Sequence, residues 1–314
     1  MRDAFFTALA DLARVDERVW ALTGDLGIGL FDDFEAAAPG RFLNVGIAEQ
    51  SLVGVAAGLA YAGQRPFAYS IAPFVTSRPH DQVRVDLAMA RADVTLVGVG
   101  GGLSYGYLGP THHAIEDLAL MRSLPGMTVL APGDPADVRR ATRAAHAIEG
   151  PVYLRLGKNG ERSVLPDDAP FVVGRATKVR SGGHVTIAST GAILAEAVDA
   201  ADLLAAGGIE ATILHFGTVK PFDGDALLTA AARTGTVVTL EEHSIVGGLG
   251  SAAAEALAEG GLSARLKRLG LPDAFAHEVG SREHLLAHFG LDAHAVAATV
   301  ERLLDAPVRH AVVA

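Results

Sequence analysis

Short apolar segments alternate with longer amphipathic segments along most of the chain. In the first half, runs of β-branched and apolar residues predict strands near 19–22, 67–72, 94–99, 128–131 and 152–155. Apolar positions repeating every three or four residues predict helices near 3–14, 47–62, 80–91, 113–122 and 135–148. Strands that alternate regularly with helices are typical of a parallel α/β domain.

The pattern is interrupted once and then resumes. Residues 159–170 (NGERSVLPDDAP) combine Gly and Pro with charged residues and predict a linker. Beyond it we expect strands near 185–189, 210–214, 236–240 and 264–269, and helices near 191–206, 223–233, 247–259 and 291–304. The sequence therefore predicts two α/β domains with parallel or mixed sheets, at 1–160 and 171–314.

Length, charge and composition exclude several functional classes for this protein. A length of 314 residues favours two domains, and a formal charge of -10 without any basic run argues against nucleic-acid binding. No apolar run reaches the roughly 18 residues of a membrane helix, and the N-terminal residues lack a signal-peptide pattern, so we expect a cytoplasmic protein. The absence of cysteine excludes thiol catalysis and cysteine-ligated metals, and no metal site is expected in this chain.

The segment 44–50 (NVGIAEQ) places one acid, Glu49, at the start of a small-residue helix with no charged partner near it in the sequence. Residues 51–63 are so rich in small and apolar residues that the helix is expected to be buried nearly all round. Burial raises a carboxyl pKa, which suits a group that holds and returns a proton near neutral pH. A purely structural role, in which Glu49 only favours the positive end of the helix dipole, remains equally open.

A glycine-rich segment follows the predicted strand 94–99. Residues 97–113 (VGVGGGLSYGYLGPTHH) contain six glycines before the adjacent His112 and His113. The Pro-Thr pair before the histidines interrupts any direct run into a helix, so a dinucleotide site is not expected. A loop at the carboxyl end of a strand that presents His112 or His113 to a small ligand is the better interpretation, against the commoner structural role of a single histidine.

Two further segments carry charge at strand ends. Arg155 and Lys158 follow the strand near 152–155 and could hold an anionic substrate group, although a solvated ion-pair face is the commoner use of such residues. Residues 241–243 (EEH) precede a glycine-rich turn into a helix. Because their spacing matches no metal-ligand pattern, they indicate an interface or helix-packing element.

Taken in order, GIAEQ, the aromatic stretch 67–74, GPTHHAIEDLALMR and EEHSIVGGLG resemble the C-terminal half of transketolase. The relatives of that half include 1-deoxyxylulose-5-phosphate synthases and the β subunits of 2-oxo acid dehydrogenase E1 components. The resemblance implies a pyrimidine-binding domain followed by a C-terminal domain. In the family, the other half binds the diphosphate of thiamine diphosphate and Mg²⁺ through a Gly-Asp-Gly motif, and this sequence contains none.

The chain therefore resembles the small subunit of a split transketolase. It is expected to need a separate N-terminal subunit that carries the Gly-Asp-Gly motif, and to form an α₂β₂ heterotetramer with it, because the family's cofactor lies at a subunit interface. The resemblance implies that thiamine diphosphate performs the chemistry while the protein binds and orients it.

The same resemblance assigns catalytic and cofactor-binding residues. Glu49 matches the glutamate that hydrogen-bonds the aminopyrimidine N1′ atom, and Phe74 matches an aromatic residue that stacks on that ring. Asp25 matches an acid near the thiazolium ring. Ile71 belongs to the same cofactor-binding set and replaces a residue that is often aromatic or cationic in relatives. His112 matches a histidine that contacts the donor oxygen, which makes it the second catalytic residue.

A substrate-binding set also follows from the resemblance. Arg155, and Arg2 with it, match arginines that hold a substrate phosphate, and His113 is expected beside them. Leu108 stands where transketolases carry an Asp that binds a sugar hydroxyl, a loss of about 1–3 kcal/mol for a substrate that needs this acceptor. Gly100 stands where transketolase has a phosphate-binding His. These departures predict an atypical ketose or acceptor.

Other classes of function stay open. A β subunit of a decarboxylating 2-oxo acid enzyme, or a deoxyxylulose phosphate synthase-like enzyme, would share the fold and Glu49. The segment 109–122 (GPTHHAIEDLALMR) favours transketolase over the E1 β chains. A non-catalytic scaffold is the third interpretation, and the presence of Glu49, Phe74 and His112 argues against it.

Overall fold

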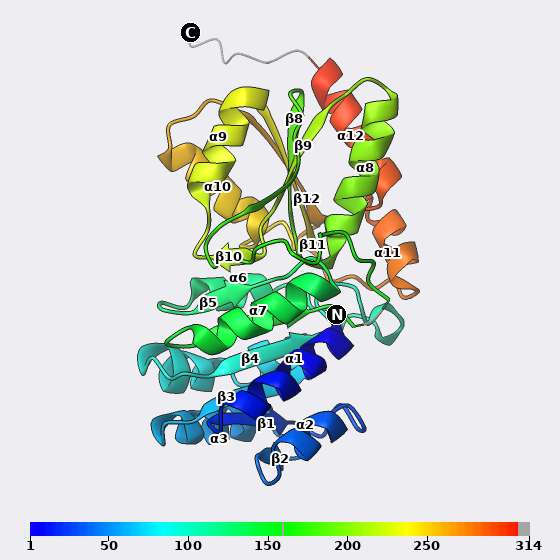
Figure 1. Cartoon of the computed structure of the whole chain (residues 1–314). Helices are drawn as coiled ribbons and strands as arrows, with labels where there is room; N and C mark the ends of the chain where they lie inside the picture. The colour runs from blue at the N-terminus through cyan, green and yellow to red at the C-terminus, as the bar shows by residue number, and fades with distance from the viewer. Residues whose placement is uncertain (159, 307–314) are drawn as a thin grey trace.

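The computed structural model describes residues 1–158 and 160–306. Two α/β units lie one above the other in Figure 1, each a sheet covered by helices on both faces. This confirms the predicted fold class of two α/β domains with parallel or mixed sheets. The predicted linker residue at 159 and the end of the second predicted domain, 307–314, lie outside the described residues.

The first sheet is parallel except at one edge. Its strands are β1 (Val19–Thr23), β2 (Phe42–Asn44), β3 (Arg65–Ile71), β4 (Thr95–Val99), β5 (Thr128–Leu130), β6 (Val152–Leu156) and β10 (Thr218–Lys220), in the order β10-β5-β6-β4-β3-β1-β2. Ile71 pairs with Val99, which pairs with Leu156, so β3, β4 and β6 end side by side. Loops that follow these strands therefore meet at one edge of the sheet.

Helices cover both faces of the first sheet. On one face α1 (Arg2–Val15) and α7 (Pro135–Ala147) lie side by side, with α2 (Asp32–Ala37) beyond them (Figure 1). On the other are α3 (Glu49–Tyr61), α4 (Ala72–Ser77), α5 (His80–Gln82), the π-helical turn η1 (Val83–Met89) and α6 (Asp117–Ser123). Separate apolar clusters fill the two interfaces, so both faces of the strands are buried as the unbroken apolar runs predict.

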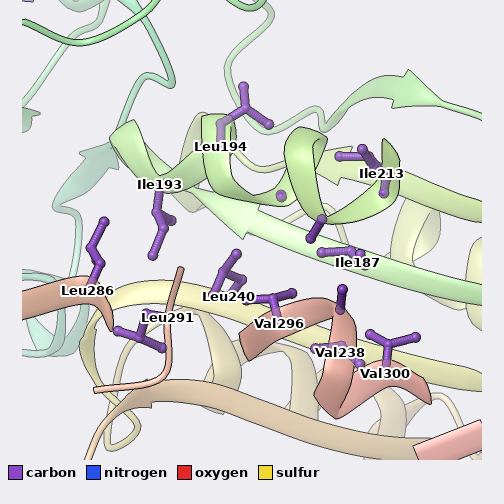
Figure 2. Packing of buried hydrophobic residues seen from close by; sticks show 14 of the residues in the cluster. Ile187, Ile193, Leu194, Ile213, Val238, Leu240, Leu286, Leu291, Val296 and Val300 are labelled. Carbon is purple, nitrogen blue, oxygen red and sulfur yellow. The ribbon is translucent and has the colours of Figure 1, made fainter. Parts of the chain in front are cut away.

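The second sheet has the order β12-β11-β8-β9-β7. Its strands are β7 (Thr177–Arg180), β8 (Val185–Thr190), β9 (Ala211–His215), β11 (Thr236–Ser244) and β12 (Arg265–Leu271), with β7 antiparallel. The helices are the short η3 (Gly191–Ile193), α8 (Leu194–Ala206), α9 (Gly224–Thr234), α10 (Leu249–Glu259), α11 (Arg282–His288) and α12 (Ala293–Asp305). Figure 2 shows how α8 and α12 close over Ile187, Val238 and Leu240 of the sheet.

Several short elements were not predicted: β2, β7, β10, α2, α4 and α11. Each is too short for its pattern of apolar and polar positions to be recognised in the sequence. β10 matters most, because Thr218 pairs antiparallel with Leu130 and so attaches a strand from the second half of the chain to the first sheet. The predicted helix 113–122 begins only at Asp117, because Ala114 bridges to the glycine-rich loop instead.

The described ranges contain no helix with the length and apolar character required to cross a membrane.

Candidate active site

Glu49 lies at the first position of α3, at the edge where the parallel strands end. Its side chain is only 4% exposed, as expected for the buried acid. The expectation that it lacks a charged partner is wrong, because Arg78 Nη1 lies 3.0 Å from Oε1 and 2.9 Å from Oε2. The Ser70 hydroxyl donates a longer bond of 3.4 Å to Oε1. The partner was invisible in the sequence because it is 29 residues away.

The prediction that α3 is buried nearly all round is also wrong for the single chain. Its inner residues, including Leu52 and Ala56, pack on the sheet. The outer face is exposed along Ser51, Gly54, Val55, Gly58 and Tyr61. The small and apolar residues of α3 therefore line both a buried inner face and an exposed outer face.

Arg78 also covers Phe74. The guanidinium carbon lies 3.7 Å from the centroid of the Phe74 ring, a cation–π contact. The two residues are four apart at α4 and its C-cap, where side chains stack on one face. That spacing is the signal in the sequence that could have revealed Arg78, and the sequence reasoning missed it.

His112 completes this group. Its ring meets the Phe74 ring edge-on with centroids 5.0 Å apart, and Tyr105 lies 6.2 Å away on another side. Partial burial lowers the pKa of His112, and the positive charge of Arg78 lowers it further. The imidazole is therefore neutral near pH 7, and it can either donate or accept a hydrogen bond. The structure thus brings Glu49, Phe74 and His112 together, as the resemblance implies.

The glycine-rich loop folds back on itself. Gly101 and Gly102 bridge to Ala114, and the turn η2 (Gly106–Leu108) forms the tip, where Leu108 is 53% exposed. His113 is buried and lies inside the loop, with Nε2 3.3 Å from the Gly106 carbonyl oxygen. This placement argues against direct substrate contact by His113 and makes it a support for the loop.

Gly100 lies beneath the Tyr105 ring. Its φ of +82° is one that glycine adopts without strain, and a Cβ there would lie 2.0 Å from Tyr105 Cε2. A histidine at this position, as in transketolase, would require Tyr105 to move. The Tyr105 ring therefore occupies the space that a phosphate-binding histidine at this position would fill.

The remaining cofactor candidates lie at strand ends. Asp25 follows β1, is exposed, has a φ of 60° and accepts a 3.0 Å bond from the Asn44 amide. Ile71 is the last residue of β3 and is nearly buried at the start of α4. Both positions agree with a ligand near this edge, and their contacts with a cofactor stay predictions.

Arg155 is buried in an ion pair with Asp117. Its Nε lies 2.8 Å from Asp117 Oδ2, and Nη2 donates to Asp117 Oδ1 and to the carbonyl oxygens of Ala114 and Glu242. The Tyr153 hydroxyl donates to the same carboxylate at 2.6 Å. The Arg155 side chain is only 5% exposed and links the first domain to Glu242 of the second. This burial argues against the predicted role in binding a substrate phosphate, and also against a solvated ion-pair face.

One cation lies over the Tyr105 ring, and a second is near enough to influence its pKa. Lys158 Nζ lies 4.8 Å from the Tyr105 ring centroid. Burial raises the pKa of Tyr105, and the nearby charge of Arg2 opposes that rise. A cavity of about 250 Å³ is lined by Lys158 and Ser104, and also by Arg282 and the acids Glu161 and Glu283. Arg2 and Lys158 are therefore the two cations near Tyr105 that are available to bind an anionic group.

The acidic segment in β11 holds the domains and α10 in place. Glu242 accepts a 2.7 Å bond from the Leu103 amide and pairs with Arg282 at 2.8 Å. Glu241 accepts bonds from the first amides of α10, at Leu249 and Gly250, and burial raises its pKa to about 7. These contacts confirm that this segment is an interface and helix-packing element.

Metal-binding side chains do not cluster in the described part of the chain: no three His, Asp or Glu residues gather there as a candidate metal site. The catalytic candidates are instead one acid, one aromatic ring and one imidazole. Such a set can hold and orient a planar heterocycle.

Two α/β domains with an acid, an aromatic ring and a histidine at one sheet edge form the class of two-domain α/β protein that the resemblance to transketolase implies. The sequence matches "Transketolase, pyrimidine binding domain" over residues 1–162 and "Transketolase, C-terminal domain" over residues 174–296. The chain belongs to the transketolase family.

Two of the most similar relatives have about the length of this chain. It is 43% identical over 294 residues to the 6-deoxy-6-sulfo-D-fructose transketolase subunit SqwH of Clostridium sp. (strain MSTE9), covering 93% of this chain and 91% of that one. It is 38% identical over 300 residues to an apulose-4-phosphate transketolase subunit of Phocaeicola vulgatus, covering 95% of each.

A solved structure titled "Split gene transketolase, inactive beta4 tetramer" matches with a TM-score of 0.90 and 40% identity, covering 96% of this chain and 97% of that one. Over nearly its full length, the chain is therefore similar to proteins that are named as subunits of split transketolases.

Proposed function

We propose that this chain forms, with a separate N-terminal subunit, a transketolase that depends on thiamine diphosphate and Mg²⁺. The complex transfers a two-carbon ketol unit from an atypical ketose to an aldehyde. The observation that carries the proposal is the convergence of Glu49, Phe74 and His112 at one sheet edge.

The residues fit the aminopyrimidine end of the cofactor. Glu49 is a nearly buried carboxylate able to accept a hydrogen bond from a proton-bearing ring nitrogen, and Phe74 offers a ring face beside it. When bound, thiamine diphosphate supplies the nucleophilic carbon that attacks the donor ketone. Glu49 would hold and orient the pyrimidine ring, and His112 would hydrogen-bond the donor oxygen. Asp25 and Ile71 are proposed as further contacts.

The partner would bring the diphosphate site. This sequence has no Gly-Asp-Gly motif, so the N-terminal subunit is proposed to hold the diphosphate and Mg²⁺. The exposed small-residue face of α3 begins beside Glu49 and supports assembly at this edge. An α₂β₂ heterotetramer is the proposed state, because a two-fold axis would create two equivalent sites.

The substrate is proposed to carry an anionic group. The printed names of two relatives specify a sulfo sugar and a sugar phosphate, both of which are anions. Lys158 lies over the Tyr105 ring and the charge of Arg2 acts on the Tyr105 pKa, whereas Arg155 is saturated by Asp117. We therefore assign the anion to Lys158 and Arg2. The exposed apolar side chain of Leu108 supports a sugar different from the usual pentose phosphates.

The test is reconstitution with the N-terminal subunit, thiamine diphosphate and Mg²⁺. The complex is screened with sulfonated and phosphorylated ketoses, free ketoses, hydroxypyruvate and pyruvate as donors, each with an aldehyde acceptor. Turnover of an anionic ketose that requires both subunits and the cofactor is expected.

Other outcomes would correct the proposal. Decarboxylation of pyruvate as the main reaction would favour the 2-oxo acid or deoxyxylulose phosphate synthase-like alternatives. Efficient conversion of xylulose 5-phosphate with ribose 5-phosphate would remove the proposed atypical substrate. Tight binding of thiamine diphosphate and Mg²⁺ by the chain alone would contradict the proposed division between subunits.

A further inference from the structure

Arg78 occupies both groups that the cofactor ring would use. A single nitrogen, Nη1, reaches both Glu49 oxygens at 3.0 and 2.9 Å. The guanidinium carbon lies 3.7 Å from the Phe74 centroid, within contact of the ring face. A planar cation that donates to Glu49 and covers Phe74 makes the same kinds of contact that an aminopyrimidine ring would make. In the proposed binding mode, the ring and Arg78 would compete for the same space.

Arg78 gives the Glu49 carboxylate a charged hydrogen-bond partner that it would otherwise lack. Glu49 is 4% exposed, and its other hydrogen bond in the described part of the chain is the long one from Ser70. A nearly buried carboxylate without a partner is strongly unfavourable. Arg78 therefore stabilises the cofactor-free arrangement of the α3 start.

The contact is also easy to break. Arg78 is 45% exposed, so its guanidinium can regain water when it leaves Glu49. Breaking this pair therefore costs less than breaking one that is buried on both sides. The arginine is thus available to exchange for another planar donor.

We propose that Arg78 is a stand-in for the aminopyrimidine ring, held against Glu49 and Phe74 in the free chain and displaced when the cofactor binds. The inference rests on the proposed function, which places the ring between these residues. Displacement lowers the apparent cofactor affinity, because only the fraction of molecules with Arg78 turned away can bind. Arg78 is accordingly a gating residue for cofactor loading rather than a catalytic residue.

The first experiment measures thiamine diphosphate binding to the assembled complex with Mg²⁺ by isothermal titration calorimetry. If Arg78 holds the site for about nine-tenths of the time, Arg78→Gln tightens the dissociation constant about tenfold. Arg78→Lys, whose ammonium cannot lie flat across the ring, gives a smaller gain. Arg84→Gln removes an exposed arginine from the neighbouring turn η1 and serves as the matched control, with wild-type affinity.

Unchanged or weaker binding by Arg78→Gln would overturn the inference, since it would mean that Arg78 does not compete with the ring. Should that variant fail to assemble, Arg78→Lys decides: wild-type or weaker affinity counts against the stand-in. Glu49→Gln separates the two proposals. If Glu49→Gln weakens binding while Arg78→Gln changes nothing, only the stand-in fails. If Glu49→Gln binds and turns over normally, the proposed function itself fails.

The second experiment uses urea unfolding of the isolated full chain. Wild type, Glu49→Gln, Arg78→Gln and the double variant form a cycle that isolates the coupling between the two side chains. A favourable coupling is expected in the free chain. Zero coupling there would show that the arginine does not hold the acid before the cofactor arrives.

Discussion

Two arginine–carboxylate pairs in this protein look alike in their contacts and differ in what they can do. Arg155–Asp117 is buried on both sides, and its atoms also bind Tyr153 and two carbonyl oxygens. Arg78–Glu49 pairs a buried acid with an arginine that is 45% exposed and lies on an aromatic ring.

The difference in burial distinguishes an ion pair that only stabilises the fold from one whose arginine can exchange for a ligand. Removing a partner from a saturated, buried pair leaves an uncompensated charge, so such a pair resists exchange. A half-exposed guanidinium recovers its hydration when it moves. The sequence predicted Arg155 as a substrate-binding arginine and did not indicate Arg78, which lies on Glu49 and Phe74.

The largest expected effect breaks the buried pair. Arg155→Met should lower the free energy of unfolding by about 3–5 kcal/mol, because Asp117 would remain buried and unpaired. Arg78→Met should cost less, about 1–3 kcal/mol, since water can reach Glu49 from the side that the arginine leaves. Urea unfolding of the isolated chain measures both. Equal costs would mean that the two pairs are not different in kind.

The next effect concerns turnover. Glu49→Gln keeps the shape of the side chain and removes its charge, and should reduce kcat of the reconstituted complex about 100-fold, the scale of a lost proton-handling group. The unfolding free energy should change by no more than about 1 kcal/mol. Glu35→Gln, at an exposed acid in α2, is the control and should behave as wild type. Full activity of Glu49→Gln would support the non-catalytic scaffold.

A smaller effect tests the cations near Tyr105. Lys158→Gln should raise KM for an anionic donor about tenfold, equivalent to about 1.4 kcal/mol, and leave kcat nearly unchanged. KM for an uncharged ketose should not change. Lys178→Gln, at an exposed residue of β7, provides the comparison. An equal rise in KM for charged and uncharged donors would show that Lys158 does not bind the anion.

The smallest effect is the pH dependence of stability that comes from Glu241, which accepts bonds from the first amides of α10. Burial raises the pKa of Glu241 from 4.5 to about 7, so the folded state binds more protons than the unfolded state between these values. Stability from this group is present below pH 4.5 and is lost as the pH rises through about 7.

Burial lowers the pKa of His243 from 6.5 to about 4, which acts in the opposite sense below pH 6.5. Between pH 6 and pH 8 the wild type should therefore lose about 1 kcal/mol of unfolding free energy relative to Glu241→Gln. Urea unfolding at the two pH values measures the difference. A parallel pH dependence in both proteins would exclude Glu241 as the source.

The fold could be predicted from the sequence to a large extent. Continuous apolar runs such as β4 and amphipathic repeats such as α7 are long enough to show their period. β10 could not be predicted, because its three residues form a strand only by pairing with β5 from the other half of the chain.

The site was predicted in part. Glu49 and His112 stand out locally, as a lone acid at a helix start and a histidine after a glycine-rich loop. Tyr105, which covers Gly100, and the burial of His113 depend on how that loop folds back. Neither follows from residue type or spacing.

By itself, the sequence determined the alternation of strands and helices, the family, and the positions of an acid and a ring at a sheet edge. Only the tertiary structure decided which arginine meets which acid. The physical reason is that the energy of an ion pair depends on distance and burial, and both arise when loops distant in the chain meet at one edge of a parallel sheet. Glu49 has a partner because β3 and α4 place Arg78 beside it.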